Sequence, residues 1–321
     1  MKNRIIKSFK FKGKLKKNNY FEGWYYKFVN QDQSATLAFI PGISLNKENP
    51  HAFIQVILNQ DKKIITEYLS YEIAEFNYDF KLNKLKVGNN IFYYDRVLID
   101  INQDKLRIFG ELKLSNLTPI NTSLLRPSIM GFFEYLPFME CNHDVVSMNH
   151  DLSGTMSFNG KDIDFSKGKG YIEKDYGKSF PEEYVWIQSN NFKKIGTSIM
   201  VSYATIPYLG LKFKGFIVNL VFRKQEYRFA TYNFSHAKVI ESSENSVTFE
   251  FKKYSYRLLV KAVNFHTVAL ASPKKGHMTS QIKEGLTGEV DLKFCNKDAL
   301  VYEGKGQSAG VEIMLKGDLD V

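Results

Sequence analysis

Three short stretches of the sequence concentrate carboxyl and imidazole side chains. They are "YFEGWYYKFV" (20–29), "FMECNHDVVSMNHDLSG" (138–154) and "GYIEKDYGKSFPEEYVWIQSNNF" (170–192). Carboxyl groups and imidazoles are the usual general acids and bases of enzymes, so these side chains are the candidate catalytic residues. They are Glu22, Glu140, His143, His150, Glu173 and Asp175.

The third stretch continues into a segment whose two faces differ in polarity. In an extended strand, Val185, Ile187 and Ser189 lie on one face, and Trp186, Gln188 and Asn190 lie on the other. An ordinary core strand buries only apolar side chains, whereas a binding pocket combines apolar surface with a few polar groups. The second face is therefore a candidate pocket wall.

The first stretch places aromatic side chains on the same strand face as Glu22, since Trp24 and Tyr26 follow it at intervals of two residues. Aromatic faces stabilise positive charge, and amides hydrogen-bond to hydroxyl groups. The candidate substrate-binding residues are Trp24, Tyr25, Tyr26, Tyr176, Trp186, Gln188 and Asn190. The structural alternative is that the tryptophans anchor cores and that the charged groups form turns or hydrogen-bond networks.

The second stretch also raises the question of a metal site or a cysteine nucleophile. Cys141, His143 and His150 offer suitable ligand atoms, but their spacing matches no structural zinc site and no fourth ligand is evident. We therefore predict no metal. No nucleotide-binding loop or hydrolase motif is present either, so the sequence predicts no cofactor.

The bulk composition is that of a globular protein, with 321 residues, 44% apolar and 24% charged. The two cysteines, Cys141 and Cys295, form no C-x-x-C pair, which favours a reducing compartment. The sequence contains no apolar run close to the roughly 20 residues of a spanning helix, and the basic N-terminus lacks the apolar segment of a signal peptide. A cytoplasmic location is expected.

The positive charge is concentrated in the first 17 residues, which hold eight Lys or Arg and no acid. Removing these eight charges from the formal net charge of +10 leaves +2 for the rest, which argues against a nucleic-acid-binding face. This basic arm also carries Ile5, Ile6, Phe9 and Phe11. The favoured interpretation is a solvated tail or basic edge strand; the alternative is an anchor on an anionic membrane surface.

Strand signals dominate the whole chain. Many short segments rich in β-branched and aromatic residues alternate in polarity, and turn residues separate them at short intervals. This pattern predicts an all-β protein of antiparallel meanders, in a barrel or sandwich. The best helix candidate is "PSIMGFFEYL" (127–136).

A faint internal repeat suggests two similar domains. Trp24 precedes Phe53 of "AFIQVIL", and Trp186 precedes Phe216 of "GFIVNLV", at nearly the same spacing. We therefore predict two β domains in tandem, one over 1–150 that includes the arm and one over 151–321. One large barrel is the alternative.

Together and in this order, the three stretches resemble the conserved blocks of the tocopherol cyclase family, as does the tail "GHMTSQIKEGLTGEVDLKF" with the later "SAGVEI". The resemblance implies two lipocalin-like antiparallel β-barrel or sandwich domains in tandem, and an amphiphilic isoprenoid ligand such as a prenyl quinol. Tyr176 stands where the family usually has an indole, and Asp175 where Asn is common. These departures leave the substrate open.

Two functional hypotheses follow. The first is a cofactor-independent enzyme that protonates a prenyl double bond, so that a phenol oxygen closes a ring or water adds. Such an enzyme needs a carboxyl group whose pKa is raised by an apolar site, a site that excludes water, and aromatic faces beside the cation. The second is a non-catalytic lipocalin-like carrier of a lipophilic ligand. A scaffold on a membrane surface, held by the basic arm, is a weaker third.

Overall fold

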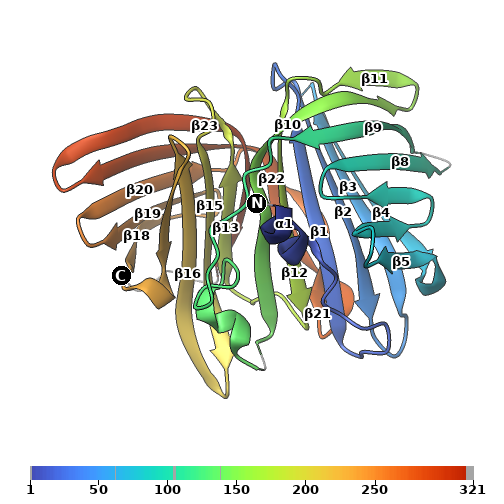
Figure 1. Cartoon of the computed structure of the whole chain (residues 1–321), viewed down its shortest axis with the longest axis horizontal. Helices are drawn as coiled ribbons and strands as arrows, with labels where there is room; N and C mark the ends of the chain where they lie inside the picture. The colour runs from blue at the N-terminus through green and yellow to red at the C-terminus, as the bar shows by residue number, and fades with distance from the viewer. Residues whose placement is uncertain (1, 62, 104–105, 138, 316–321) are drawn as a thin grey trace. The chain divides into compact units, whose positions relative to one another are not determined.

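The computed structural model describes residues 2–61, 63–103, 106–137 and 139–315, so the predicted domain limits at residues 1 and 321 lie outside the described residues (Figure 1). Strands form two antiparallel sheets. The predicted all-β class is confirmed. Within the described ranges the only α-helix is α1 (Lys2–Phe9), and no described helix has the length and apolar character needed to cross a membrane.

The first sheet is a long meander that curls over its own inner face. Its edge strands β4 and β5 are consecutive in the chain and joined by the short turn η1 (Ile73–Glu75). In order, its strands are β4 (Lys63–Glu72), β3 (His51–Gln60), β2 (Ala35–Leu45), β1 (Tyr20–Val29), β12 (Lys169–Gly177), β10 (Cys141–Phe158), β9 (Arg107–Ser115), β8 (Arg96–Asn102), β7 (Asn90–Phe92), β6 (Lys84–Val87) and β5 (Phe76–Asp79), with β11 (Lys161–Asp164) paired to β10.

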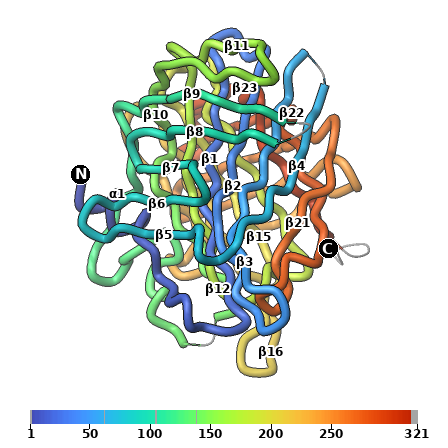
Figure 2. Tube along the Cα trace, turned by 90° about the vertical axis from the view of Figure 1, so that its right-hand side faces the viewer, coloured from blue at the N-terminus to red at the C-terminus, as the bar shows by residue number. Residues whose placement is uncertain are grey.

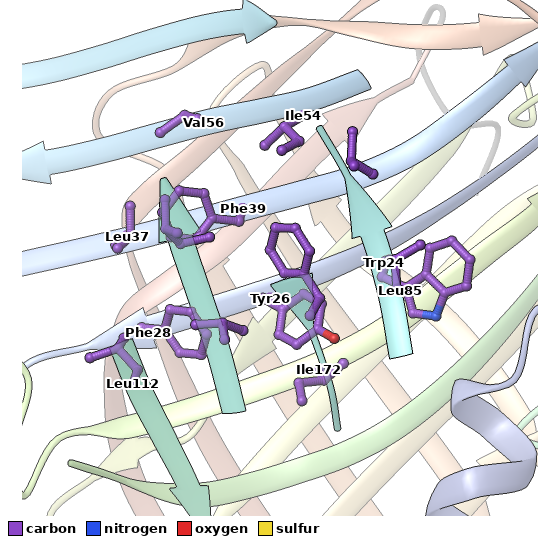
Figure 3. Packing of buried hydrophobic residues seen from close by; sticks show 14 of the residues in the cluster. Trp24, Tyr26, Phe28, Leu37, Phe39, Ile54, Val56, Leu85, Leu112 and Ile172 are labelled. Atoms are coloured by element: carbon purple, nitrogen blue, oxygen red, sulfur yellow. The ribbon is translucent and has the colours of Figure 1, made fainter. Parts of the chain in front are cut away.

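Because of this curl, side chains from both halves of the first sheet meet in one core. Figure 2 shows β5 to β8 crossing over β1 to β3, and Figure 3 shows Leu85 of β6 beside Trp24 of β1. The alternation of β1 explains which side chains enter this core, since Trp24, Tyr26 and Phe28 all belong to it. The two edges do not pair with each other, so the sheet is not a closed barrel.

The second sheet follows the same plan. Its edges are again consecutive strands, β17 and β18, joined by η3 (Thr231–Asn233). In order, its strands are β17 (Gln225–Ala230), β16 (Leu211–Phe222), β15 (Ser198–Tyr208), β13 (Tyr184–Ser189), β23 (Ala299–Met314), β22 (His277–Asn296), β20 (Tyr256–Val263), β19 (Ser246–Lys253) and β18 (His236–Ser242), with β14 (Asn191–Phe192) on β23 and β21 (Val268–Lys274) on β22.

The sequence repeat corresponds to equivalent strands of the two sheets. Trp24 and Trp186 lie in β1 and β13, and Phe53 and Phe216 lie in β3 and β16. The two tryptophans, however, lie on different faces of their strands relative to the core. Trp24 belongs to the core of the first sheet, whereas the core of the second sheet takes Val185 and not Trp186. A shift of one residue moves a side chain to the other face of a sheet.

The two compact units are not two consecutive halves of the chain, because each is built from three separate segments. The first unit comprises Met1–Thr122, Cys141–Phe180 and Ala271–Ser280, and the second comprises Ser123–Glu140, Pro181–Leu270 and Gln281–Val321. The structure therefore differs from the predicted boundary at residue 150, which falls inside β10. The reason is strand pairing, because β10 and β12 connect β9 to β1 in the first sheet.

The helix expected over 127–136 is reduced to the 3₁₀ turn η2 (Gly131–Tyr135). Gly131 has φ of +61°, a left-handed conformation that an α-helix cannot continue through. This correction concerns only a loop of the second unit.

The basic arm is not a solvated tail or an edge strand, and that prediction is wrong. Its first residues form α1, and Phe9 and Phe11 are buried in the first core with Ile5. The indole N–H of Trp24 donates a hydrogen bond to the carbonyl of Phe9 at 2.8 Å. A helical period explains the result, because it places Ile5 and Phe9 on one face while the basic side chains stay exposed.

If α1 is part of the core, Phe9→Ala should lower the free energy of unfolding by about 3–5 kcal/mol, the usual cost of emptying a buried phenylalanine site. Lys14→Ala, at an exposed position of the same arm, is the matched control and should change it by less than about 0.5 kcal/mol. Urea denaturation measures both. Equal, small effects would mean that the arm does not pack as described.

Candidate acid–base site

The candidate site residues fall into two sets, one in each unit. The second unit holds Glu140, Trp186, Gln188 and Asn190. The first unit holds the remaining nine, which β-strand alternation divides between the two faces of its sheet. They are Glu22, Trp24, Tyr25, Tyr26, His143, His150, Glu173, Asp175 and Tyr176.

On the inner face of the first sheet, Glu22 forms a buried ion pair. Its carboxylate lies 3.1 Å from the ammonium of Lys174, and both side chains are fully buried. The carboxylate also accepts hydrogen bonds from the backbone N–H groups of Lys12 and Gly13, and from the Tyr20 hydroxyl at 2.6 Å. A carboxylate with this many donors is held in one place, so its contacts favour a structural role.

Lys174 is tied to the same network. Its ammonium donates a hydrogen bond to the carbonyl of Lys10, and burial lowers its pKa from the ordinary range even with Glu22 beside it. The ammonium also lies over the rings of Trp24 and Tyr176, at 5.6 and 5.1 Å. The arm, β1 and β12 are thus joined by one buried positive charge.

The aromatic residues of the inner face belong to the packing of the core. Trp24 stacks on Tyr78 with ring centroids 6.3 Å apart, and the Tyr26 hydroxyl donates to the carbonyl of Tyr93 at 3.0 Å. Figure 3 shows Trp24 and Tyr26 among the packed side chains of this core. The side chain of Tyr176 is partly exposed and packs against the same core. The predicted ligand-binding role of these three residues stays a prediction.

On the opposite face of the first sheet, three ionisable side chains meet. In the ladder of β10 and β12, His143 pairs with Asp175, and Glu173 lies one step along the same face. Nδ1 of His143 lies 2.8 Å from Oδ1 of Asp175, and Nε2 lies 3.5 Å from Oε2 of Glu173. The Tyr171 hydroxyl donates a hydrogen bond to Glu173 at 2.6 Å. We call His143, Glu173, Asp175 and Tyr171 the acid–base cluster.

The charge state of the cluster follows from its neighbours. Burial by itself lowers the pKa of His143, but the carboxylates of Asp175 and Glu173 outweigh it and raise that pKa to about 9. His143 is therefore an imidazolium at neutral pH. With two carboxylates and one imidazolium, the cluster carries a net charge of −1 and holds a transferable proton.

The same three side chains are close enough to be considered as metal ligands, since their ligand atoms lie within 4.8 Å of one another. The two carboxylates, however, face different nitrogens of the His143 ring. The geometry favours an ion-paired imidazolium over a metal centre.

The other candidates of the 138–154 stretch do not join the cluster. His150 pairs with Gly170 on the inner face, where burial lowers its pKa to about 3 and keeps the ring neutral. Gly170 is required there, because a Cβ would lie 2.1 Å from Nε2 of His150. Glu140 is exposed and belongs to the second unit. Nearness in sequence therefore did not mean nearness in space.

In the second unit, the expected difference between the two faces of β13 is present. Val185 and Ile187 enter the core, while Trp186 and Gln188 are buried on the other face. Gln188 donates a weak hydrogen bond of 3.5 Å to the side-chain oxygen of Asn190. The predicted role of this face in ligand binding stays a prediction.

Besides the contact of Tyr20 with Glu22, sequence reasoning missed two further tyrosine–carboxylate contacts among the described residues. Tyr171 contacts Glu173 in the first unit, and the Tyr184 hydroxyl donates to Glu312 in the second. Strand alternation could have found the first, since Tyr171 precedes Glu173 by two residues and shares its face. The second joins residues far apart in the chain and left no local signal.

The fold is shared with solved structures of low sequence identity. CghA with Sch210972 has a TM-score of 0.61 at 7% identity, covering 92% of this chain and 88% of that chain. Kievitone hydratase from Nectria haematococca has a TM-score of 0.53 at 8% identity, with coverage of 92% and 88%. A putative AttH from Nitrosomonas europaea has a TM-score of 0.53 at 12% identity, covering 92% of both chains.

These likenesses define the class of the protein as a lipocalin-like β protein with two domains. The sequence profile of the tocopherol cyclase-like family matches residues 120–315, which is more than half of the chain and includes the acid–base cluster. The chain therefore belongs to the tocopherol cyclase-like family. No curated protein matches the sequence.

The raised pKa of His143 predicts a pH dependence of stability. A group whose pKa rises from 6.5 to about 9 on folding contributes its full stabilisation below pH 6.5 and loses it as the pH rises through 9. The stability difference between the wild type and His143→Gln should therefore shrink by about 3 kcal/mol across this window. Denaturant titrations at several pH values measure it. His266→Gln, at an exposed position, is the control, and a difference independent of pH would contradict the assigned charge.

The buried ion pair predicts a second stability effect. Lys174→Met leaves the Glu22 carboxylate buried without its counter-charge and should cost about 3–5 kcal/mol. The double variant with Glu22→Gln should recover part of that loss. Lys169 lies on the same strand as Lys174 and forms a more exposed ion pair with Asp151. Lys169→Met breaks that pair and should cost less than about 1 kcal/mol. Similar costs for the two lysines, measured by urea denaturation, would argue against a buried pair.

Proposed function

We propose that this protein is a cofactor-independent enzyme of the cyclase or hydratase type. Its substrate would be a lipophilic alkene, of isoprenoid or prenyl quinol character, that carries a polar oxygen-bearing head. The observation that carries the proposal is the His143 imidazolium between Asp175 and Glu173. Membership in the tocopherol cyclase-like family supports it.

The cluster has two properties that suit such a reaction. It holds a proton at neutral pH, and its net negative charge would stabilise a carbocation. In the proposed step, a proton passes from the cluster to one alkene carbon and leaves a tertiary cation. The phenol oxygen of the substrate, or a water molecule, then forms the new C–O bond and returns its proton to the cluster. Cyclisation is therefore an isomerisation, and hydration adds one water.

The acid strength of the cluster limits the substrate. An imidazolium with a pKa near 9 is a weak acid and would protonate an isolated double bond slowly. An alkene conjugated with an electron-releasing oxygen is protonated more easily. We therefore expect slow turnover of an isolated prenyl double bond, and we assign His143 as the proton store that Glu173 and Asp175 position.

Gly23 is the residue of β1 that lies beside the cluster on the same face of the sheet. It lies directly opposite Asp175 in the ladder of β1 and β12, and Tyr25 lies opposite Glu173. A Cβ added at Gly23 would meet no atom closer than 3.8 Å. Gly23→Ala should therefore fold normally, yet narrow the approach to Asp175. This makes it a steric probe of the site that leaves every ionisable group in place.

A non-catalytic carrier is the second candidate function. It is favoured by the tyrosine hydroxyls and ion pairs that already occupy many polar groups, as at Glu22 and Glu173. A carrier would bind the same lipophilic class but release it unchanged. The experiment below separates the two.

The test begins with the lipid that co-purifies with the protein, identified by extraction and mass spectrometry, and a panel of prenyl quinols. Product formation should fall at least about a hundredfold in His143→Gln, Glu173→Gln and Asp175→Asn, since each removes a proton-transfer group or its partner. The wild-type rate should fall as the pH rises above about 9, where His143 loses its proton.

Glu140→Gln is the matched control, because this carboxylate was also a sequence candidate but is exposed outside the cluster. It should keep wild-type activity. Binding of the quinol without product in the wild type would favour the carrier. Unchanged activity in all three cluster variants, with normal melting temperatures, would reject the cluster as the catalytic group.

A further inference from the structure

The hairpin between β15 and β16 projects from its sheet. β13 pairs with β15 only as far as Ala204, and β17 pairs with β16 only from Ile217 onward. Within the described sheet, residues 206–214 therefore have strand partners only in the hairpin itself. At the tip, Leu209 and Leu211 are 72% and 75% exposed. An exposed two-stranded ribbon with leucines at its tip is not explained by the core of this unit.

A second apolar loop of the same unit lies next to this ribbon. Residues 123–135 carry Leu124 and Leu125, which are 89% and 79% exposed, and then the turn η2. Phe133 of that turn contacts Phe213 of the hairpin, with ring centroids 6.2 Å apart. The Tyr135 hydroxyl holds the loop by donating to the carbonyl of Leu124 at 2.9 Å. The two loops thus belong to one surface.

The charged side chains of the two loops are mostly basic, and Glu134 of η2 is the one acidic residue within 123–135 and 205–214. No Asp or Glu occurs in the sequence between residues 184 and 225 or between 123 and 133. Arg126 and Lys212 are exposed there, and Lys214 lies at the base of the hairpin, paired with Glu183 at 3.4 Å. Exposed leucines and aromatics flanked by basic side chains are typical of proteins that insert loops into anionic lipid surfaces.

We propose that Leu124, Leu125, Leu209 and Leu211 form a docking surface for an anionic lipid bilayer. The leucines would enter the region between head groups and acyl chains, and Arg126 and Lys212 would contact lipid phosphates. Phe132 and Tyr135, both exposed, suit the interface itself. This surface goes beyond the proposed chemistry and does not depend on it, although a lipophilic substrate would be collected from the same phase.

The proposal moves the membrane contact away from the basic arm. The apolar residues Ile5, Phe9 and Phe11 of the arm are committed to the first core and cannot enter lipid without unfolding it. The arm can still contribute an electrostatic alternative through its exposed basic side chains, among them Lys14, Lys16 and Lys17. Variants of the basic arm and of the leucine loops distinguish electrostatic binding by the arm from insertion of the loops.

The test is flotation of the full chain with vesicles of phosphatidylcholine alone and of phosphatidylcholine mixed with phosphatidylglycerol. The wild type should float with the anionic vesicles, and added salt should weaken the binding. Leu209→Ser with Leu211→Ser should weaken it by about tenfold or more, because two leucines lose their burial in lipid. Leu124→Ser with Leu125→Ser should act in the same direction. All four sites are exposed, so melting temperatures should not change.

The matched control is Ile195→Ser with Leu300→Ser, which removes two exposed aliphatic side chains elsewhere in the second unit and should leave flotation unchanged. Three results would overturn the proposal. One is a wild type that floats with neither vesicle. Another is binding lost in Lys14→Gln with Lys16→Gln and Lys17→Gln but kept in the leucine variants. The third is self-association in solution that the leucine substitutions abolish, which would mark an interface between copies of the chain.

Discussion

The first unit depends on the way one strand, β12, carries charge on both faces. Its inner face buries Lys174, which must be neutralised because an unpaired ammonium in a core is prohibitively costly, and Glu22 supplies that charge at 3.1 Å. Its outer face presents Glu173 and Asp175 to His143. The inner pair fixes the strand, and the fixed strand holds the outer cluster.

The arm belongs to the same constraint. The Glu22 carboxylate accepts hydrogen bonds from the backbone N–H groups of Lys12 and Gly13, and the Lys174 ammonium donates one to the carbonyl of Lys10. The segment after α1 therefore completes the hydrogen-bond network on the inner face. The first core is consequently filled by the chain itself. The outer face, with its ionised cluster, is the part of the sheet to which we assign the proposed chemistry.

Much of the fold could be predicted from local pattern. Strand alternation correctly placed Trp24 and Tyr26 together, and separated Val185 and Ile187 from Trp186. It failed for the arm, because Ile5 and Phe9 follow a helical period that the density of lysines obscured. For the site, composition suggested six acids and bases, but only His143, Glu173 and Asp175 meet.

The sequence by itself determined the all-β class, the repeated topology and the family, because these depend on periodicity and on ordered motifs. Only the tertiary structure decided the roles of the charged groups. Whether a carboxylate lies in a core beside Lys174, beside an imidazole, or in solvent depends on strand register and on partners far away in the chain. Glu22, Glu173 and Glu140 look alike in sequence, and their surroundings alone make them different.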